Sequence, residues 1–444
     1  MRICLSFSIL LGQLLICASW TKAADPVDAT TFAVGVASRD ITPQKPTPMW
    51  GYGDRHAMLS QGTLDPLYAK AVVIHAGQDK LAIVGTDLGR GPTAAMMEEI
   101  RAELREKAGI EHCLITGSHS HHTPVIELID REGLGKGTFD DAVAYSQSLP
   151  DMLVEVICEA DAAVQPARVG AVSKEVSYNR NRQSKREPKA VDPMLGVIRF
   201  DDLEGKPIAV LVNFAAHPVM TSPLVLKFSA DYPGFMKKKV EESLSTFCVF
   251  LQGASGDMSV NAPEGVSGPQ AFGEVLADQV IELAESCVTA VPDEPSIQAK
   301  VDPMKFESRV EFNNPLVMAA YSKAFFPELV QNYAEESRNG INTELNTVLL
   351  NKHIALVGGS GEFFCNHANL LKQRSYVDHT FFLGYCNGHN LYFPTIEAVS
   401  EGGYGADPGV APVEIGAGER MMNRALMNLY TMLGKFPKKK AANQ

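Results

Sequence analysis

Near-continuous apolar runs, separated by segments with helical periodicity, are the feature that most constrains the fold of this chain. Residues 207–214 (PIAVLVNF) and 247–252 (FCVFLQ) are apolar at almost every position, as in strands that are covered on both faces. Residues 80–86 (KLAIVGT) and 113–117 are also strand-like, whereas residues 93–107 space their apolar side chains as a helix does. This alternation predicts an α/β fold of mixed β-sheets flanked by helices.

The second half of the chain continues the same pattern. We expect helices at 272–286 and 414–433, and a pair of strands within 346–357 that turns at Asn351-Lys352. A candidate domain break lies at 291–295 (VPDEP). Because residues on both sides of that break are needed in one predicted site, we expect a single large catalytic domain over residues 24–444.

The N-terminus has the features of a secretory signal peptide. Arg2 supplies a positive charge, residues 3–18 are mostly apolar, and residues 21–23 (TKA) offer small side chains for cleavage. The apolar run is short for a membrane span. We therefore expect residues 1–23 to be removed and the protein to be secreted or periplasmic.

Composition limits the classes of partner. The chain has 444 residues, of which 45% are hydrophobic, and a formal net charge of -12. The apolar content is that of a globular protein, and the negative charge argues against a nucleic acid or an anionic membrane surface as the main partner. No CxxC pair is present, so we expect the cysteines to be buried small apolar residues rather than zinc ligands. No sequence feature defines an oligomeric state.

Polar clusters follow the predicted strands, at the places where active sites of α/β proteins gather. These clusters are residues 119–122 (HSHH), His217, residues 256–261 (GDMSVN), Glu362, and the pair Tyr392 and Tyr404. Taken singly, each could be an ordinary turn. Together, His119, His217 and Glu362 supply the histidine and carboxylate ligands typical of a catalytic zinc site. A zinc-bound water has a pKa near 7, which would make hydroxide available for hydrolysis.

The same clusters, in the same order, resemble the motifs of the neutral/alkaline (non-lysosomal) ceramidases. Residues 117–124 (GSHSHHTP) resemble the SHTHSGP-type motif, residues 213–218 (NFAAHP) the N-x-x-x-HP motif, residues 256–261 the GDVSPN motif, and residues 361–363 the GEF motif. Residues 35–43 (GVASRDITP) are similar to the opening segment of the family, and Tyr392 and Tyr404 have its tyrosine spacing. The resemblance covers residues 34–404 and concerns the N-terminal catalytic domain. Since the chain ends soon after residue 433, we expect it to lack the family's C-terminal immunoglobulin-like domain.

The resemblance implies a zinc-dependent amidohydrolase that cleaves an N-acyl amide such as ceramide into sphingosine and a fatty acid. It implies that Zn²⁺ is bound by His119, His217, Glu362 and Tyr392, and that His121, Arg182 and Tyr404 face the substrate. The implied substrate is a small lipid or N-acyl amide, which is compatible with peripheral contact with a membrane. An ester or phosphoester hydrolase, or a non-catalytic binding protein on the same fold, remain alternatives.

Two mechanisms are compatible with these residues. Ser259 matches the serine that some accounts of the family treat as the nucleophile, but no base adjoins it in sequence and an unactivated serine is a weak nucleophile. We favour attack by zinc-held hydroxide, with Ser259 orienting the substrate. His122 replaces a small residue of the family motif, and we expect it to alter the choice of substrate.

Overall fold

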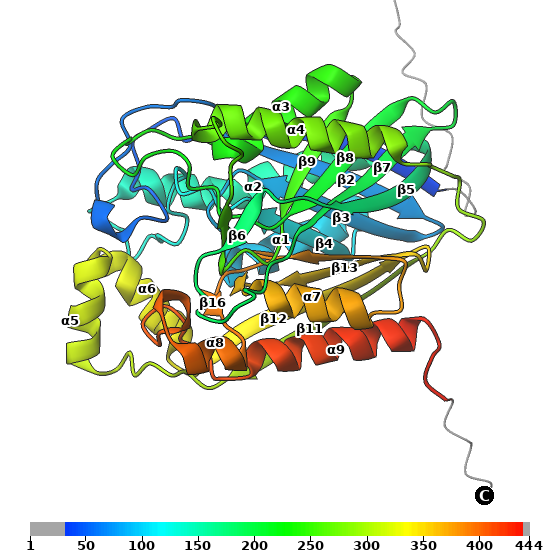
Figure 1. Cartoon of the computed structure of the whole chain (residues 1–444). Coiled ribbons are helices and arrows are strands. Elements are labelled where there is room, and N and C mark those ends of the chain that lie inside the picture. The colour runs from blue at the N-terminus through cyan, green and yellow to red at the C-terminus, as the bar shows by residue number, and fades with distance from the viewer. Residues whose placement is uncertain (1–31, 438–444) are drawn as a thin grey trace, which may run out of the picture.

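The computed structural model describes residues 32–437, so the predicted signal peptide and the end of the basic tail lie outside the described residues. An eight-stranded sheet and a four-stranded sheet pack on each other, with helices on their outer sides (Figure 1). This arrangement confirms the predicted α/β fold with mixed sheets.

The first sheet has the strand order β4-β3-β2-β1-β5-β7-β8-β9. Its strands are β1 (Phe32–Asp40), β2 (Tyr68–Ala76), β3 (Asp79–Thr86), β4 (His112–Gly117), β5 (Gln165–Glu175), β7 (Met194–Asp202), β8 (Pro207–Phe214) and β9 (Phe247–Gln252). Most neighbours are antiparallel, but β3–β4 and β8–β9 are parallel. Parallel strands need a crossover, which α1 (Ala94–Ala108) supplies to the first pair and α3 (Asp231–Leu244) to the second.

The second sheet is built from the later part of the chain, in the order β11-β12-β13-β15. Its strands are β11 (Ile297–Phe306), β12 (Ile341–Leu350), β13 (Ile354–Gly359) and β15 (His379–Leu383). Helices α7 (Cys365–Arg374) and α9 (Ala417–Met432) cover its outer face. Between β11 and β12 the chain forms a helical hairpin, α5 (Pro315–Ala324) and α6 (Pro327–Ser337), and α5 stands away from the two sheets in Figure 1.

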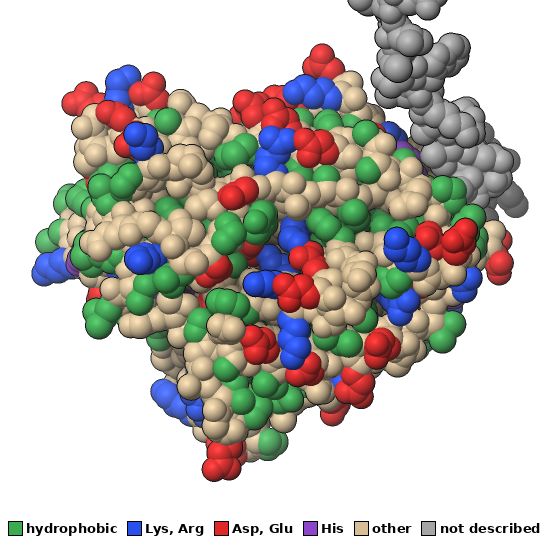
Figure 2. All heavy atoms as spheres, turned by 90° about the horizontal axis from the view of Figure 1, so that it is seen from above, with side chains coloured by type: hydrophobic (Ala, Val, Ile, Leu, Met, Phe, Trp, Pro, Cys, Tyr) green, Lys and Arg blue, Asp and Glu red, His purple; other side chains and the backbone are tan. Residues whose placement is uncertain are grey.

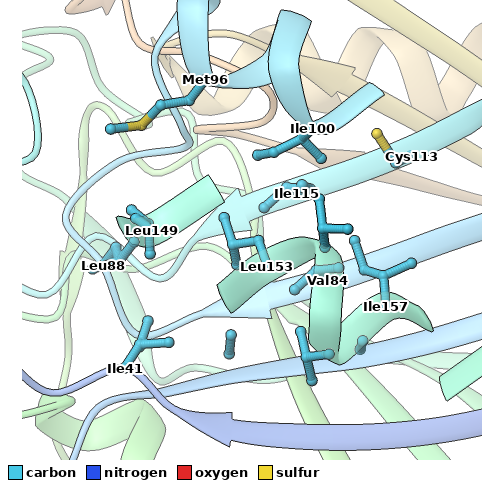
Figure 3. Packing of buried hydrophobic residues seen from close by; sticks show 14 of the residues in the cluster. Ile41, Val84, Leu88, Met96, Ile100, Cys113, Ile115, Leu149, Leu153 and Ile157 are labelled. Atoms are coloured by element: carbon cyan, nitrogen blue, oxygen red, sulfur yellow. The ribbon is translucent and has the colours of Figure 1, made fainter. Parts of the chain in front are cut away.

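Alternate residues of each strand serve different cores, as the period-2 geometry of a strand requires. In β3, Val84 points toward α1 and α2 (Asp140–Ala162), where Ile100, Leu153 and Ile157 surround it (Figure 3). Its neighbour Ile83 points into the core between the two sheets. Helices α3 and α4 (Gly268–Ser286) cover β7, β8 and β9 in the same way.

The predicted elements are present with small shifts of their ends. β8 and β9 have the predicted bounds, and the predicted strand pair within 346–357 is the antiparallel pair β12–β13. The predicted helix at 272–286 begins earlier, at Gly268, because Pro269 occupies its first turn. The hairpin α5–α6 was not predicted from the sequence.

Surface and cysteine features agree with a globular protein. Acidic, basic and hydrophobic side chains are intermixed over the face shown in Figure 2. Among residues 32–437, no helix combines the length and the apolar character that a membrane span requires. The six cysteines of this range are free, and five of them are buried, which confirms that they behave as small apolar residues.

Candidate metal centre and active site

The predicted site residues come together where strands of both sheets end. His119 lies two residues beyond β4, and His217 lies three residues beyond β8. Glu362 begins the short strand β14 (Glu362–Phe363), which follows β13 of the second sheet and forms a separate two-stranded sheet with β16 (Tyr392–Phe393). The candidate site is therefore built at the junction of the two sheets.

The turn after β4 holds His119 in one orientation. Its φ is 71°, a left-handed conformation that is uncommon for a residue with a side chain and often marks a functional site. The His119 amide donates to the Leu88 carbonyl at 2.9 Å. Its Nδ1 lies 2.8 Å from the Gly89 carbonyl oxygen. Because a carbonyl can only accept, Nδ1 carries the proton and Nε2 keeps its lone pair.

The turn after β8 fixes His217 by the same device. Its Nδ1 lies 2.7 Å from the carbonyl oxygen of Ser255, and its amide donates to the Met258 carbonyl at 3.1 Å. Nε2 of His217 therefore also keeps its lone pair. Such backbone partners, which fix the ring and its tautomer, are typical of histidines that bind metals.

Both Nε2 atoms lie beside the carboxylate of Glu362, and that of His217 also accepts from Arg182 Nη2 at 2.8 Å. Glu362 Oε2 lies 3.3 Å from His119 Nε2 and 3.2 Å from His217 Nε2. Oε1 lies 3.3 Å from Nε2 of His389. The Glu362 side chain is 4% exposed, and Oε2 is buried without a hydrogen-bond donor.

The charges around Glu362 fit a cation. Burial, together with Arg182 and His119, lowers the pKa of His217 to about 3, so this ring is neutral at pH 7. With both Nδ1 protons donated to backbone carbonyls, Glu362 Oε2 faces two unprotonated Nε2 atoms at 3.2–3.3 Å. A positive ion between these atoms would remove the repulsion between an ionised carboxylate and the lone pairs. The ligand atoms of His119, Glu362 and His389 lie within 4.8 Å of one another, as do those of His119, His121 and His217.

Three further predicted residues surround this cluster. Tyr392, in β16 (Tyr392–Phe393), pairs directly with Glu362 across the parallel β14–β16 ladder. Arg182 Nη2 lies 3.2 Å from the Tyr392 hydroxyl and 2.8 Å from His217 Nε2. The ring of Tyr404 lies 5.8 Å from that of Tyr392 and is 61% exposed, so Tyr404 is at the mouth of the site.

A groove leads from the surface to the cluster. It is bordered by Trp50, Tyr52, His121, Glu362, Tyr392 and Tyr404 on one side and by Phe325, Phe326, Leu329 and Tyr333 of the α5–α6 hairpin on the other. His121 Nε2 lies 3.3 Å from His119 Nε2. A Cβ atom at Gly51, whose φ is +101°, would lie 2.3 Å from the His121 ring, so only glycine leaves room for this histidine.

Ser259 and His122 are not among the residues that line the groove. Ser259 forms a bridge with His217 and pairs with Arg180 in the ladder of β6 (Asn179–Asn181) and β10 (Met258–Val260). As the sequence suggested, its hydroxyl has no hydrogen-bonded base among the described residues. The His122 ring is fully buried behind the groove, with Nε2 2.6 Å from Arg55 Nη2 and 3.1 Å from the Ser222 carbonyl oxygen. His122 was expected to alter the choice of substrate; because its ring is buried and does not line the groove, any such effect would be indirect.

Sequence reasoning missed His389 and Trp50. His389 follows Asn387 and Gly388, both with positive φ, in the glycine-rich segment after β15, so the rule that polar residues follow strands could have found it. Trp50 packs edge-on against His119, His121 and His389, with ring centroids 5.1, 5.6 and 5.3 Å away. A lone tryptophan in a loop carries no such signal.

Comparison with known proteins decides the family. Residues 32–271 match the family model described as neutral/alkaline non-lysosomal ceramidase, N-terminal. The chain belongs to this family. Neutral ceramidase A of Dictyostelium discoideum is 26% identical over an alignment of 273 residues. The alignment covers 53% of this chain and 36% of that protein. The chain thus spans about a third of the length of this relative.

Two solved structures share the fold. The neutral ceramidase from Pseudomonas aeruginosa has a TM-score of 0.72 and 19% identity, and the match covers 93% of this chain and 76% of that one. A ceramidase complexed with C2 has a TM-score of 0.71 at the same identity and covers 93% of this chain and 77% of its own. The family-model match ends before Glu362, whereas the structural likeness extends over both sheets.

Proposed function

We propose that this ceramidase-family chain is a zinc-dependent amide hydrolase that cleaves the N-acyl bond of ceramide or a related N-acyl lipid. The observation that carries the proposal is the buried Glu362 oxygen, 3.2–3.3 Å from two imidazole nitrogens, at the inner end of a groove with an apolar lining. The names of the relatives support ceramide as the substrate, since the family model and the Dictyostelium protein are both described as ceramidases.

The residues present suit a zinc ion. His119, His217 and Glu362 would hold it, with Tyr392 as the fourth ligand that the family resemblance implies; His389, beside Glu362, is a neighbouring donor. When bound, zinc supplies a Lewis acid that polarises the amide carbonyl and lowers the pKa of water.

Arg182 is placed to stabilise negative charge. Its Nη2 lies within 3.2 Å of both His217 Nε2 and the Tyr392 hydroxyl. A guanidinium aimed at the reaction centre favours the oxyanion that forms when the amide carbon becomes tetrahedral. Tyr404, at the mouth, would contact the substrate beyond the scissile bond.

His121 is placed to move a proton. Burial lowers its pKa well below the usual range, so the ring is neutral and can accept a proton during attack. It can then deliver that proton to the departing nitrogen, which must be protonated to leave as an amine. Ser259 lacks a base that would activate it, which favours water as the nucleophile.

The test is hydrolysis of a defined N-acylsphingosine by the purified protein. We expect sphingosine and fatty acid in equal amounts, loss of activity after chelation, and recovery with zinc. Ser259→Ala should retain turnover without an acyl-enzyme in either protein. Cleavage of simple esters but of no N-acyl amide would contradict the proposal, and an acyl-enzyme that vanishes in Ser259→Ala would contradict the mechanism.

We further propose that residues 1–23 direct export. The charge, apolar run and small residues of this segment support the proposal. N-terminal sequencing of the protein from the medium or periplasm should start near residue 24, and an uncleaved N-terminus on cytoplasmic protein would contradict it.

A further inference from the structure

The α5–α6 hairpin forms one wall of the groove. Phe325, Phe326 and Leu329 line the groove from this hairpin, opposite Tyr52. Phe326 and Leu329 are 4% and 5% exposed, in a small core of their own with Trp50. Leu316 of α5, in contrast, is 80% exposed. Helix α6, which has buried residues, is therefore the more firmly packed half of the hairpin.

Glu127 makes two of the contacts that hold α6. The Tyr333 hydroxyl donates to Glu127 Oε1 at 3.1 Å, and Asn332 Nδ2 donates to the Glu127 backbone carbonyl at 2.7 Å. An ion pair between Arg131 and Glu335 lies farther along the same contact. The position of the apolar groove wall formed by the hairpin thus depends on how α6 packs against the segment around Glu127.

The same carboxylate also holds Trp50. Glu127 Oε1 accepts from Trp50 Nε1 at 3.1 Å and from Arg90 Nη1 at 3.0 Å. The Glu127 side chain is fully buried. Burial alone would raise the pKa of Glu127, but the buried Arg90 guanidinium outweighs this effect, and the pKa is lower than the usual value. Glu127 is therefore an ionised acceptor. Hydrogen bonds to a charged acceptor are stronger than neutral ones and fix geometry more firmly.

Trp50 carries this constraint to the reaction centre, because its ring packs on His119, His121 and His389. We propose that Tyr333 is a positioning residue that, through Glu127, fixes the hairpin wall and the Trp50 ring together and thereby sets the preference for long apolar acyl chains. The kinetic part of this inference rests on the proposed function, whereas its structural part does not.

Tyr333→Phe is the direct test, since it removes one hydroxyl and leaves the ring. The matched control is Tyr321→Phe on α5, because the Tyr321 hydroxyl is buried without a hydrogen-bond partner within the described residues. Both variants are made in the chain that begins at residue 24, in which Trp50 is the only tryptophan. Rescue is sought with Tyr333→His, whose ring nitrogen can donate to Glu127.

Two readouts distinguish positioning from general destabilisation. The first is Trp50 fluorescence with dibrominated stearate as a contact quencher. We expect Tyr333→Phe to shift the Trp50 emission and to weaken stearate binding about tenfold, the factor for losing one hydrogen bond to a charged acceptor.

The second readout is hydrolysis of N-acylsphingosines with long and short acyl chains. We expect KM for the long chain to rise about tenfold, with kcat changed about twofold or less.

Unchanged emission, stearate binding and chain preference in Tyr333→Phe would overturn the inference. An equal effect of Tyr321→Phe would also overturn it, since that would mean a general loosening of the hairpin. If the fluorescence effects appear but no N-acyl amide is hydrolysed, the proposed function fails while the positioning role stands.

Discussion

At the scale of single residues, the fixed tautomers of two histidines determine what the site can bind. Backbone carbonyls accept hydrogen bonds from Nδ1 of His119 and His217, so both rings turn Nε2 toward the Glu362 carboxylate. Two imidazole nitrogens and a carboxylate oxygen at this spacing are the donor set of a divalent metal. A purely structural hydrogen-bond network would have placed a proton on one side of each contact.

His121 and His122 are neighbours in the sequence but lie in different surroundings, so their substitution should have different effects. His121→Ala should keep the metal and reduce kcat about 100-fold, the usual effect of losing a general acid–base group. His122→Ala should reduce the melting temperature and leave kcat of the folded protein within about threefold, because this ring contacts Arg55 and the Ser222 carbonyl behind the groove. Steady-state kinetics and thermal unfolding check both. A larger loss of kcat in His122→Ala would contradict the assignment.

Asp257 predicts a pH dependence of stability. Burial raises the pKa of Asp257 to about 6, despite hydrogen bonds from Cys365 and Asn181. Between pH 4 and pH 6 the folded protein thus binds a proton that the unfolded chain has lost, so stability falls as pH rises through this window. Between these pH values, the raised pKa of Asp257 lowers the free energy of unfolding by about 3 kcal/mol.

The measurement is urea unfolding with chelator present, at pH 4 and at pH 6.5, for the wild type and Asp257→Asn. The free energy of unfolding of the wild type should fall more over this interval than that of the variant. An identical pH dependence in both proteins would contradict the raised pKa.

At the scale of elements, a partly buried ion pair joins the two sheets. Arg101 on α1 donates to both oxygens of Glu344 on β12, at 2.7 and 2.5 Å. Asn387, next to the segment that bears His389, also donates to Glu344 at 3.3 Å. The pair therefore links the helix that covers the first sheet to the sheet whose strand β13 precedes Glu362.

Removing one partner should be costly. Glu344→Ala should reduce the free energy of unfolding by about 2 kcal/mol, because it leaves the partly buried Arg101 guanidinium without its carboxylate. Lys107→Gln, which breaks the exposed pair with Glu103 on the same helix, should leave the unfolding midpoint unchanged. Urea denaturation measures both. Equal midpoints for Glu344→Ala and wild type would show that the pair contributes nothing.

The elements also show what a sequence can predict. The apolar runs of β8 and β9 predicted two strands covered on both faces, because such burial leaves a continuous apolar pattern. That these strands are parallel neighbours is known only from the structure. Strands β14 and β16 have two residues each, too few for any period. Tyr392 could therefore be placed beside Glu362 only by resemblance to a family. The α5–α6 hairpin was missed, although Pro315 and Pro327 each stand at the first position of a helix.

At the scale of the whole molecule, the candidate site needs both sheets. His119 and His217 follow strands of the first sheet, and Glu362 and His389 follow strands of the second. The site therefore combines residues from both sides of the candidate break at 291–295. A single catalytic domain over 24–444 remains our prediction. The family match over 32–271 contains only half of the donors, so family membership alone does not establish a complete metal site.

Metal content of the purified protein tests the central claim most directly. Elemental analysis by mass spectrometry should find about one zinc per chain in the wild type. His217→Ala and Glu362→Gln should lose it while remaining folded by circular dichroism, and Ser259→Ala should keep it. Wild-type protein without stoichiometric zinc after reconstitution, or His217→Ala that retains it at the wild-type level, would contradict the account.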